Sequence, residues 1–553
     1  MSGKNLRAID LYSGVGGWSL GLAMAGIDVV ASYELSNAAN QTNLLNNGHA
    51  THTVDLRTLR LDALPAHIDI VVGSPPCTEF SFSNRGGGGD IKDGLLDVIT
   101  FLTIVDHLKP RWWVMENVPR VATIIDKELG YRGRLARFRH LAMKSVVLNM
   151  EEFGLPQRRR RCLVGNLDFD LLRTYTDGLE AKTLGDVVSA LECDVVEDPL
   201  FGVQIPRADL REHVPEPYLD PEERRINEAG KTAHPVYNAM PFPDPQDRSV
   251  RTITATCTRV SRESVIIEQP GQSGCYRRLT VRERACLQGF PITYQFFGTS
   301  YGQKLRMVGN AVPPAFSFYV GHAIRRTSRH KLPTLHERAA SRAAPEEVPP
   351  VTRPDRNGRA FPTKRRFRFA IPELRFKSGV RFEMVNFSNE DRTEWKIRFF
   401  FGTSKDICNI DLDEPLNARL RSAIPANKLM AVEAELSRLR AFLAQSDLRR
   451  MQSVWSHKGP GGTRPFAVID QLGATGLSVS DLLRAGDHLD SEEAIRAALS
   501  AQYGRELASL PGVPKLMRNA PLIHSGMLVG TTANIAFARH FVRDVPTPRR
   551  VAR

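Results

Sequence analysis

The sequence lacks long apolar runs and paired cysteines, and each absence excludes a class of protein. No segment reaches the roughly 18 consecutive apolar residues of a membrane-spanning helix. The first ten residues lack the apolar stretch of a secretory signal, so we expect a cytoplasmic, nucleoid-associated protein. The seven cysteines form no Cys-x-x-Cys pair, which argues against structural zinc and for free thiols. We therefore expect no metal site and no disulfide framework.

Positive charge is in excess. The 553 residues include 75 Lys and Arg against 61 Asp and Glu, a formal net charge of +14. This balance favours a polyanionic partner, with nucleic acid the first candidate, although an ordinary basic protein can share it. Hydrophobic residues make up 42% of the chain, enough for ordinary cores, so a wholly disordered protein is excluded.

Strand-like and helix-like patterns alternate in the first part of the chain. Short apolar runs that predict strands occur at residues 8–11, 29–33, 69–72, 112–115 and 163–164. Helical patterns lie between them, and the alternation predicts an α/β fold with a parallel sheet and crossover helices. Ligands bind such sheets at the carboxyl ends of the strands, where most of the chemically interesting residues fall.

The remainder of the chain divides by composition. We assign residues 1–166 and 300–329 to the α/β domain. Residues 167–299 are rich in proline and predict a small, loop-rich domain. Residues 330–364 have no apolar period and predict a linker. Residues 365–553 alternate at period two before turning helical, which predicts an α+β domain.

A glycine-rich turn follows the first predicted strand. Asp10-Leu-Tyr-Ser-Gly-Val-Gly-Gly17 leads into a helical pattern, and glycines there would let the backbone approach a cofactor closely. Glu34 ends the next strand, 24 residues after Asp10, where it could accept hydrogen bonds from ribose hydroxyls. The pattern suits a nucleoside cofactor, although an ordinary tight turn would look the same.

Three further clusters carry reactive or charged groups. Ser74-Pro-Pro-Cys77 places a thiol on a loop stiffened by proline, as a nucleophile or as a structural cysteine. Glu116, in Glu116-Asn-Val-Pro119, ends a strand and is a candidate acid or hydrogen-bond donor to a ring nitrogen; the alternative is a turn. Gln157-Arg-Arg-Arg-Arg-Cys162 has four arginines in a row, which by default indicate a basic surface.

Together and in this order, the clusters resemble the cytosine-C5 methyltransferase family. Asp10–Gly17 is similar to its cofactor motif, and Pro75-Pro-Cys77 with Phe80 and Ser81 is similar to its nucleophile loop. Glu116-Asn-Val118 is similar to its acid motif, and Gln157, Arg159 and Arg161 match its Gln-x-Arg-x-Arg motif. Residues 278–291 are similar to the motif that scaffolds the recognition domain, Val308–Val312 to the last cofactor motif, and Arg251–Thr254 to the Thr-Leu element of the recognition region. The resemblance covers residues 6–327. It implies a Rossmann-like S-adenosylmethionine-dependent domain with a target-recognition domain at 167–299.

The resemblance also implies residue roles. Cys77 would attack C6 of cytosine, Glu116 would contact the N3 edge, Arg161 would contact O2, and Arg159 would help to order the site. S-adenosylmethionine would supply the methyl group for C5, with Glu34 on its ribose and Asp55 on its adenine amino group. The implied cofactor pocket consists of Asp10, Tyr12, Gly14, Gly16, Gly17, Glu34, Asp55, Leu56, Pro76, Leu95, Asn310 and Ala311. Tyr12 departs from the family, which usually has Phe there.

Double-stranded DNA is the substrate that the resemblance implies, with the target base flipped out and restriction-modification or anti-phage defence as the setting. Residues 83–90 would then form a loop that closes over the base, or a flexible surface segment. Two alternatives stay open: a methyltransferase of tRNA cytosines, and a non-catalytic DNA-binding regulator on the same fold.

For residues 365–553 we expect an accessory module that binds DNA or a protein partner. The basic and aromatic segments 364–368 and 455–464 could contact phosphates, or they could be a solvated basic face. Asp391 and Glu394-Trp-Lys396 resemble a nuclease motif, but the spacing is too short, so exposed charges on an edge strand are the preferred interpretation.

Overall fold

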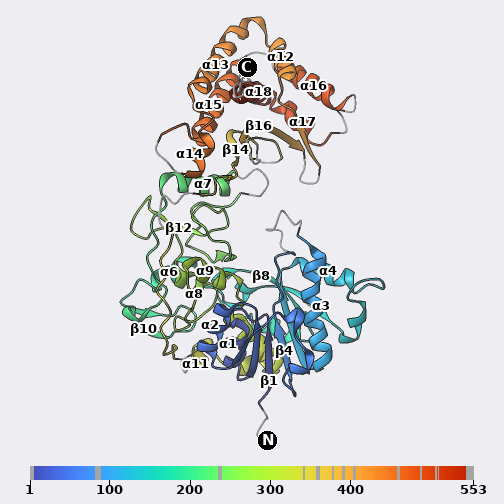
Figure 1. Ribbon diagram of the computed structural model, residues 1–553, viewed down its shortest axis with the longest axis vertical. Helices are drawn as coiled ribbons and strands as arrows, with labels where there is room; N and C mark the ends of the chain where they lie inside the picture. The colour runs from blue at the N-terminus through green and yellow to red at the C-terminus, as the bar shows by residue number, and fades with distance from the viewer. Residues whose placement is uncertain are drawn as a thin grey trace, which may run out of the picture. The chain divides into compact units, whose positions relative to one another are not determined.

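The computed structural model describes residues 5–80, 89–233, 239–339, 343–355, 361–376, 379–388, 393–402, 406–457, 461–485, 489–504, 507 and 510–542. The chain forms two compact units (Figure 1). Unit 1 consists of Met1–Asn227 and Pro241–Asp355, and unit 2 of Glu228–Met240 and Arg356–Arg553. Among the described residues, no helix is both long enough and apolar enough to cross a membrane.

Unit 1 is built on a seven-stranded sheet in the order β3-β2-β1-β4-β5-β8-β6. The strands are β1 (Arg7–Leu11), β2 (Asp28–Glu34), β3 (Ala50–Thr53), β4 (Ile70–Gly73), β5 (Trp112–Asn117), β6 (Lys144–Asn149) and β8 (Arg160–Gly165). The first five in the sheet run parallel, and β8 runs antiparallel to both of its neighbours. The predicted α/β class is confirmed, but the purely parallel sheet is wrong at this edge. Only residues 150–159 separate β6 from β8, too few for a crossover helix, so the chain returns as an antiparallel neighbour.

Helices cover both faces of this sheet (Figure 1). They are α1 (Gly17–Met24), α2 (Asn37–Asn47), α3 (Ile91–Leu108), α4 (Arg120–Glu128), α5 (Phe169–Thr174), α9 (Tyr301–Asn310) and α10 (Pro314–Ile324). Alternate strand residues enter different cores: Ile70 and Val72 pack with α1 and α10, whereas Val71 packs with α3 and α4. This two-sided burial explains the short, uniformly apolar strand sequences.

Residues between α5 and α9 form the predicted loop-rich region. Its elements are α6 (Leu184–Ala190), β9 (Val195–Glu197), β10 (Gln204–Pro206), α7 (Pro221–Thr232), β11 (Val250–Arg251), β12 (Ile266–Glu268), β13 (Tyr276–Arg278) and α8 (Val281–Leu287). β11 pairs in parallel with β7 (Gln157–Arg158), which joins this region to the end of the large sheet. Unit 1 extends into the predicted linker: α11 (Leu335–Ala339) lies there, and Lys304 Nζ donates to the carbonyl oxygen of Pro350 at 2.9 Å.

Unit 2 has the predicted α+β composition. Its antiparallel sheet runs in the order β14 (Arg368–Arg375), β15 (Arg381–Ser388), β16 (Thr393–Gly402) and β17 (Ile407–Ile410). The helices are α12 (Glu414–Ser422), α13 (Ala426–Gln445), α14 (Met451–His457), α15 (Pro465–Arg484), α16 (Leu489–Tyr503), α17 (Val513–Arg518) and α18 (Ala520–Val542). α15 and α18 pack closely on the sheet through glycines: a Cβ at Gly526 would lie 2.5 Å from the Phe382 ring, and one at Gly476 would lie 2.8 Å from Leu374.

Candidate active site

The loop that carries Cys77 begins where β4 ends and is tied to neighbouring elements. Trp18 Nε1, on α1, donates a hydrogen bond to Ser74 Oγ at 3.0 Å. Asn117, the buried last residue of β5, donates from Nδ2 to the carbonyl oxygen of Pro75 at 3.0 Å. Because both donors belong to elements packed in the core, they fix the start of the loop. Sequence analysis assigned no separate role to Asn117, and its position next to Glu116 is the signal that could have indicated one.

Glu116 and Arg161 form an ion pair at the edge of the sheet next to this loop. They lie on the antiparallel strands β5 and β8, and Arg161 Nε is 2.9 Å from Glu116 Oε1. The side chains are 9% and 14% exposed respectively, so the pair is largely removed from water. At this burial a charged pair is held much more firmly than on a surface, which keeps both groups in place.

The other three predicted catalytic residues, Glu116, Arg159 and Arg161, all lie close enough to Cys77 for their charges to act on its thiol. Burial raises the pKa of the Cys77 thiol, the positive charges of Arg161 and Arg159 oppose the rise, and the charge of Glu116 adds to it. Burial therefore favours the protonated form of the thiol in the free protein. Any change that neutralises Glu116 would leave two guanidinium groups acting on the thiol and would lower its pKa.

Arg159 and Gln157 connect the sheet to the loop-rich region. Arg159 is buried and donates to the carbonyl oxygens of Ile253 and Ala311, both at 3.2 Å. Burial, together with the charge of Arg161, lowers the pKa of Arg159 to about 9. Gln157 donates to the carbonyl oxygen of Leu287 at 3.0 Å and accepts from the amide of Ile253 at 2.8 Å. The side chains of Gln157 and Arg159 thus point inward and hold the loop-rich region against the sheet. Arg159 is therefore not part of the basic surface expected by default.

At the carboxyl ends of β1 and β2, a carboxylate faces a turn with free space. Gly14 N donates to Glu34 Oε2 at 3.1 Å, and Ser36 N donates to Glu34 Oε1 at 2.9 Å. Gly14 has a φ of +52°, and a Cβ there would meet no atom within 4 Å. The turn therefore leaves open space beside a carboxylate at the end of a strand.

The other two glycines of the turn are enclosed. A Cβ at Gly16 would lie 2.2 Å from Asn43 Oδ1, and a Cβ at Gly17 would lie 1.9 Å from the carbonyl oxygen of Val312. Packing against α2 and against the segment before α10 therefore accounts for glycine at both positions. The structure separates them from Gly14, whereas the sequence grouped all three.

The hydroxyl of Tyr12, which a phenylalanine would lack, has a partner. Tyr12 adopts a positive φ of 53° and donates to Asp97 Oδ1 at 3.2 Å. Asp97 also accepts two hydrogen bonds from Arg57, at 2.8 Å and 2.7 Å. The amide of Arg57 in turn donates to Asp55 Oδ1 at 2.9 Å, where Asp55 caps a short 3-10 helix at Leu56–Thr58. This chain of contacts connects Tyr12 to the turn that holds Asp55 and Leu56.

The remaining predicted cofactor residues differ in exposure. Asp10 is fully buried, accepts a hydrogen bond from Ser19 Oγ at 2.7 Å, and has its pKa raised to about 7 by burial. Its other oxygen, Oδ1, is buried without a hydrogen-bond partner among the described residues. Pro76 and Asn310 are exposed, and Leu95 and Ala311 are buried.

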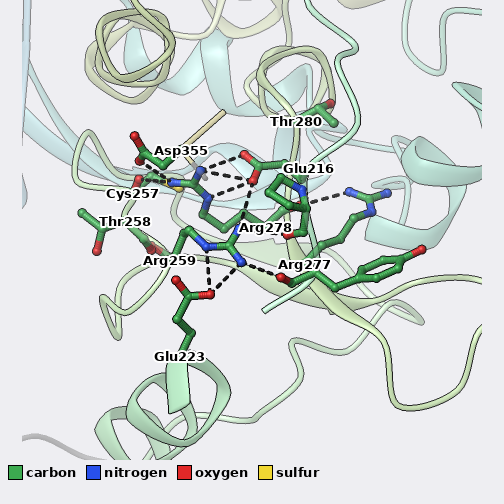
Figure 2. A network of polar contacts seen from close by, with 12 residues as sticks. Glu216, Glu223, Cys257, Thr258, Arg259, Arg277, Arg278, Thr280 and Asp355 are labelled. Carbon is green, nitrogen blue, oxygen red and sulfur yellow. Dashed lines mark hydrogen bonds and ion pairs between the residues drawn. The ribbon is translucent and has the colours of Figure 1, made fainter. Parts of the chain in front are cut away.

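A buried network of charges holds the loop-rich region together (Figure 2). Arg278 donates to the carbonyl oxygen of Cys257 at 2.9 Å and pairs with Glu216 at 3.1 Å, both side chains being fully buried. Arg259 pairs with Glu223 at 2.7 Å. The network therefore links the predicted scaffold motif at 278–291 to the segment after Thr254. Removal of one partner would leave an uncompensated buried charge, which is costly.

Two predictions fall on residues outside the described ranges. Residues 81–88 include Ser81 and most of the predicted closing loop; of that loop, Asp90 is described and accepts from Lys92 N at 2.9 Å as the cap of α3. Asp391 also lies outside the described ranges. Glu394 and Lys396 are exposed, as the preferred interpretation expects. The expected edge strand is wrong, because β16 lies between β15 and β17 in the sheet.

Comparison with known proteins identifies relatives of unit 1. A family model described as C-5 cytosine-specific DNA methylase matches residues 6–326. Type II methyltransferase M.HgiDI of Herpetosiphon aurantiacus is 28% identical over 331 residues, which are 58% of this chain and 94% of the relative. Type II methyltransferase M.NlaX of Neisseria lactamica is 31% identical over 317 residues, 55% of this chain and 92% of the relative. Among solved structures, the S. pombe Dnmt2 methyltransferase aligns over 58% of this chain and 99% of its own, with 19% identity and a TM-score of 0.41.

Proposed function

The chain belongs to the C-5 cytosine-specific DNA methylase family, and we propose that this DNA cytosine-C5 methyltransferase works through a covalent adduct between Cys77 and a cytosine flipped out of the duplex. The observation that supports the proposal most directly is the Glu116–Arg161 pair beside the Cys77 loop. The Cys77 thiol, the Glu116 carboxyl group and the Arg161 guanidinium group could then all contact one cytosine ring.

The chemistry explains why a thiol is needed. C5 of cytosine is a weak nucleophile until a group adds to C6. When the Cys77 thiolate forms a bond to C6, the electron pair of the C5–C6 double bond becomes available at C5. Glu116 at the N3 edge and Arg161 at O2 stabilise the charge that develops on the ring. After C5 has gained a methyl group, loss of the C5 proton restores the double bond and releases the Cys77 thiolate.

Ionisation of Cys77 follows from the same arrangement. In the free protein, Glu116 and burial raise the pKa of the thiol. When a cytosine binds, one proton is taken up between its N3 and Glu116, which removes the opposing negative charge and balances the proton that the thiol releases. Arg161 and Arg159 then stabilise the thiolate, so the nucleophile forms when the substrate base is in place.

The residues around the ends of β1 and β2 fit S-adenosylmethionine, which supplies a methyl group on a positively charged sulfur. The open space at Gly14 would admit the ligand next to the backbone. Each oxygen of Glu34 accepts one hydrogen bond from the backbone, and lone pairs remain for ribose hydroxyls. Asp55 would hold the adenine amino group. Tyr12, Leu56, Pro76, Leu95, Asn310 and Ala311 would complete the pocket.

The biological setting that we propose is modification of DNA in the cytoplasm, within a restriction-modification or related defence system. The names of the relatives support it, since they are called Type II methyltransferases. The methyl mark would distinguish modified from unmodified DNA.

Methyl transfer from radiolabelled S-adenosylmethionine to unmethylated duplex DNA tests the proposal, with bisulfite sequencing of the product. We expect label at cytosine C5 with the wild type, none with Cys77→Ala, and normal labelling with Cys193→Ala, which removes an exposed thiol elsewhere. Duplex DNA with 5-fluorocytosine should trap the wild type covalently, because fluorine at C5 cannot leave as the proton does. Label that persists in Cys77→Ala would overturn the covalent mechanism. Label on tRNA and none on DNA would overturn the choice of substrate.

A further inference from the structure

The net charge of the chain is concentrated outside the family domain. Residues 356–553 contain 32 Lys and Arg against 20 Asp and Glu, whereas residues 1–355 contain 43 against 41. The family match ends at residue 326. Almost all of the excess positive charge therefore belongs to a part of the chain that the methyltransferase chemistry does not use.

The two faces of the unit 2 sheet differ in composition. One face carries Phe382, Ile397 and Phe399, which are buried where α18 packs on the sheet. On the other face, Arg381 stands opposite Phe400 and Val385 opposite Lys396 in the antiparallel register. Residues directly opposite each other in such a pair point to the same side of the sheet. The alternation thus separates an apolar side under the helices from a basic side.

The cations of this basic face are Arg368 on β14, Arg381 on β15, and Lys396 and Arg398 on β16. The same side of β16 also carries one exposed carboxylate, Glu394, opposite Phe387. Three of the four cations surround another carboxylate, Glu383, whose side chain is fully buried. Arg368 Nε donates a hydrogen bond to Glu383 Oε2 at 3.3 Å. Arg381 Nε and Arg398 Nη1 lie 3.7 Å and 3.9 Å from its oxygens, beyond hydrogen-bond length. One negative charge thus faces three positive charges.

Three of the four cations are accessible to solvent, whereas Arg381 is largely buried. The side chains of Arg368 and Arg398 are 44% and 36% exposed, and Lys396 is exposed. The guanidinium groups of Arg381 and Arg398 lie over the Phe400 ring, 4.9 Å and 4.4 Å from its centre. Burial lowers the pKa of Arg381, the charge of Glu383 opposes this shift, and the positive charges of Arg368 and Arg398 add to it. The mutual repulsion would be relieved by a second anion.

The predicted basic and aromatic segments are used differently. Arg365 is clamped between the rings of Phe361 and Trp455, at 3.4 Å and 3.6 Å. Trp455 is buried and packs against Phe367 and Phe466. Neither a phosphate-binding surface nor a solvated basic face describes Trp455, which is buried in the core, and Arg365 is half-buried between two rings. The sheet face provides the exposed cations instead.

We infer that the basic face binds the phosphate backbone of duplex DNA and anchors the enzyme without reading sequence. Guanidinium and ammonium groups on three neighbouring strands can pair with the phosphates of a duplex, and such contacts are independent of sequence. The choice of duplex DNA as the partner rests on the proposed function. The face would supply affinity, and unit 1 the chemistry.

The test measures binding of the full chain to a fluorescent duplex of about 30 base pairs over a range of salt concentrations, without cofactor. In Lys396→Gln with Arg398→Gln we expect about a tenfold higher Kd and a salt slope smaller by about two. The matched control is Arg419→Gln with Arg438→Gln, which removes two exposed arginines from α12 and α13, on the helical side. The control should bind as the wild type does.

A third variant changes the affinity in the opposite direction. Glu383→Gln keeps an acceptor for Arg368 but removes the negative charge, so we expect tighter binding by several fold. A gain in affinity cannot arise from loss of folding. Equal binding by the wild type and the double variant at each salt concentration would overturn the inference, as would stronger competition from tRNA than from duplex DNA.

The two proposals fail separately. Methylation of DNA by the wild type, with unchanged binding in the double variant, would overturn the anchor and leave the enzyme activity in place. Weakened binding in the double variant, with no methylation of DNA by the wild type, would overturn the proposed enzyme activity and leave the DNA anchor in place.

Discussion

Alanine at two glycines of the same turn should have different consequences. At Gly17 a Cβ would lie 1.9 Å from the carbonyl oxygen of Val312 and 2.9 Å from its carbon. At Gly14 it would meet nothing within 4 Å, although φ is +52°. Gly17→Ala should therefore lower the stability of unit 1. Gly14→Ala should keep the fold and lose affinity for S-adenosylmethionine, because the added methyl group would occupy the space beside Glu34.

The magnitude of the Gly17 effect follows from the distance. Unstrained contacts of a Cβ begin near 3.4 Å, so α1 and the segment before α10 would have to separate by about 1.5 Å. Backbone lies on both sides, and no side chain can rotate away. The same helix pair is also close at Gly21, where a Cβ would lie 2.0 Å from Ser317 Oγ. Overpacking of this kind should cost about 3 kcal/mol, against about 1 kcal/mol for a left-handed alanine at Gly14.

Urea unfolding and calorimetric titration with S-adenosylmethionine measure the two quantities. Gly302→Ala on α9 is the matched control, because a Cβ there meets nothing within 4 Å and φ is not positive; it should be neutral or slightly stabilising. The packing argument is refuted if Gly17→Ala unfolds like the wild type but fails to bind the cofactor. It is also refuted if Gly14→Ala binds the cofactor normally.

Three further predictions concern the site. Asn117→Ala should lower kcat for methyl transfer and lower the free energy of unfolding by about 1–3 kcal/mol, because it removes the hydrogen bond to the carbonyl of Pro75. An unchanged kcat would contradict the role of Asn117 in positioning the Cys77 loop. Because burial raises the pKa of Cys77, kcat/KM for DNA should rise from neutral towards alkaline pH, and a flat profile would count against an ionising nucleophile. The raised pKa of Asp10, about 7 against 3.8, means that its contribution to stability is full below about pH 4 and is lost as the pH rises through about 7, on the order of 4 kcal/mol. Urea unfolding at several pH values should show this dependence in the wild type and not in Asp10→Asn; equal slopes would disprove it.

The parallel strands β1, β2, β4 and β5 were predictable because each contains a short apolar run followed by a turn or a polar residue. The runs at residues 8–11, 29–33, 69–72 and 112–115 all lie in parallel strands. The direction of β8 was not predictable from its own sequence, since Leu163 and Val164 would suit a strand of either direction. What decides the direction is the short connection from β6, together with the choice of β5 as a neighbour.

The convergence of the site could be predicted in part. Cys77, Glu116 and Glu34 each follow a parallel strand, and the carboxyl ends of parallel strands meet at one edge. The supporting contacts could not be predicted: Tyr12 reaches Asp97 across 85 residues, and Asn117 reaches the Cys77 loop across 42. Such contacts depend on how helices pack against the sheet, and no local pattern encodes that.

The number of arginines in unit 1 overstates the positive charge that this unit can offer to DNA. Many of its arginines are buried and paired: Arg278 with Glu216, Arg282 with Glu212, and Arg277 with Glu283. A paired, buried guanidinium releases no counterion when DNA binds, because it holds none. Since residues 1–355 are also nearly neutral in sum, the attraction of the whole chain to a duplex should come mainly from unit 2. The salt slope of DNA binding therefore reports on the basic face, whereas the sequence preference of methylation reports on unit 1. A variant that changes one and leaves the other intact would separate anchoring from recognition in this enzyme.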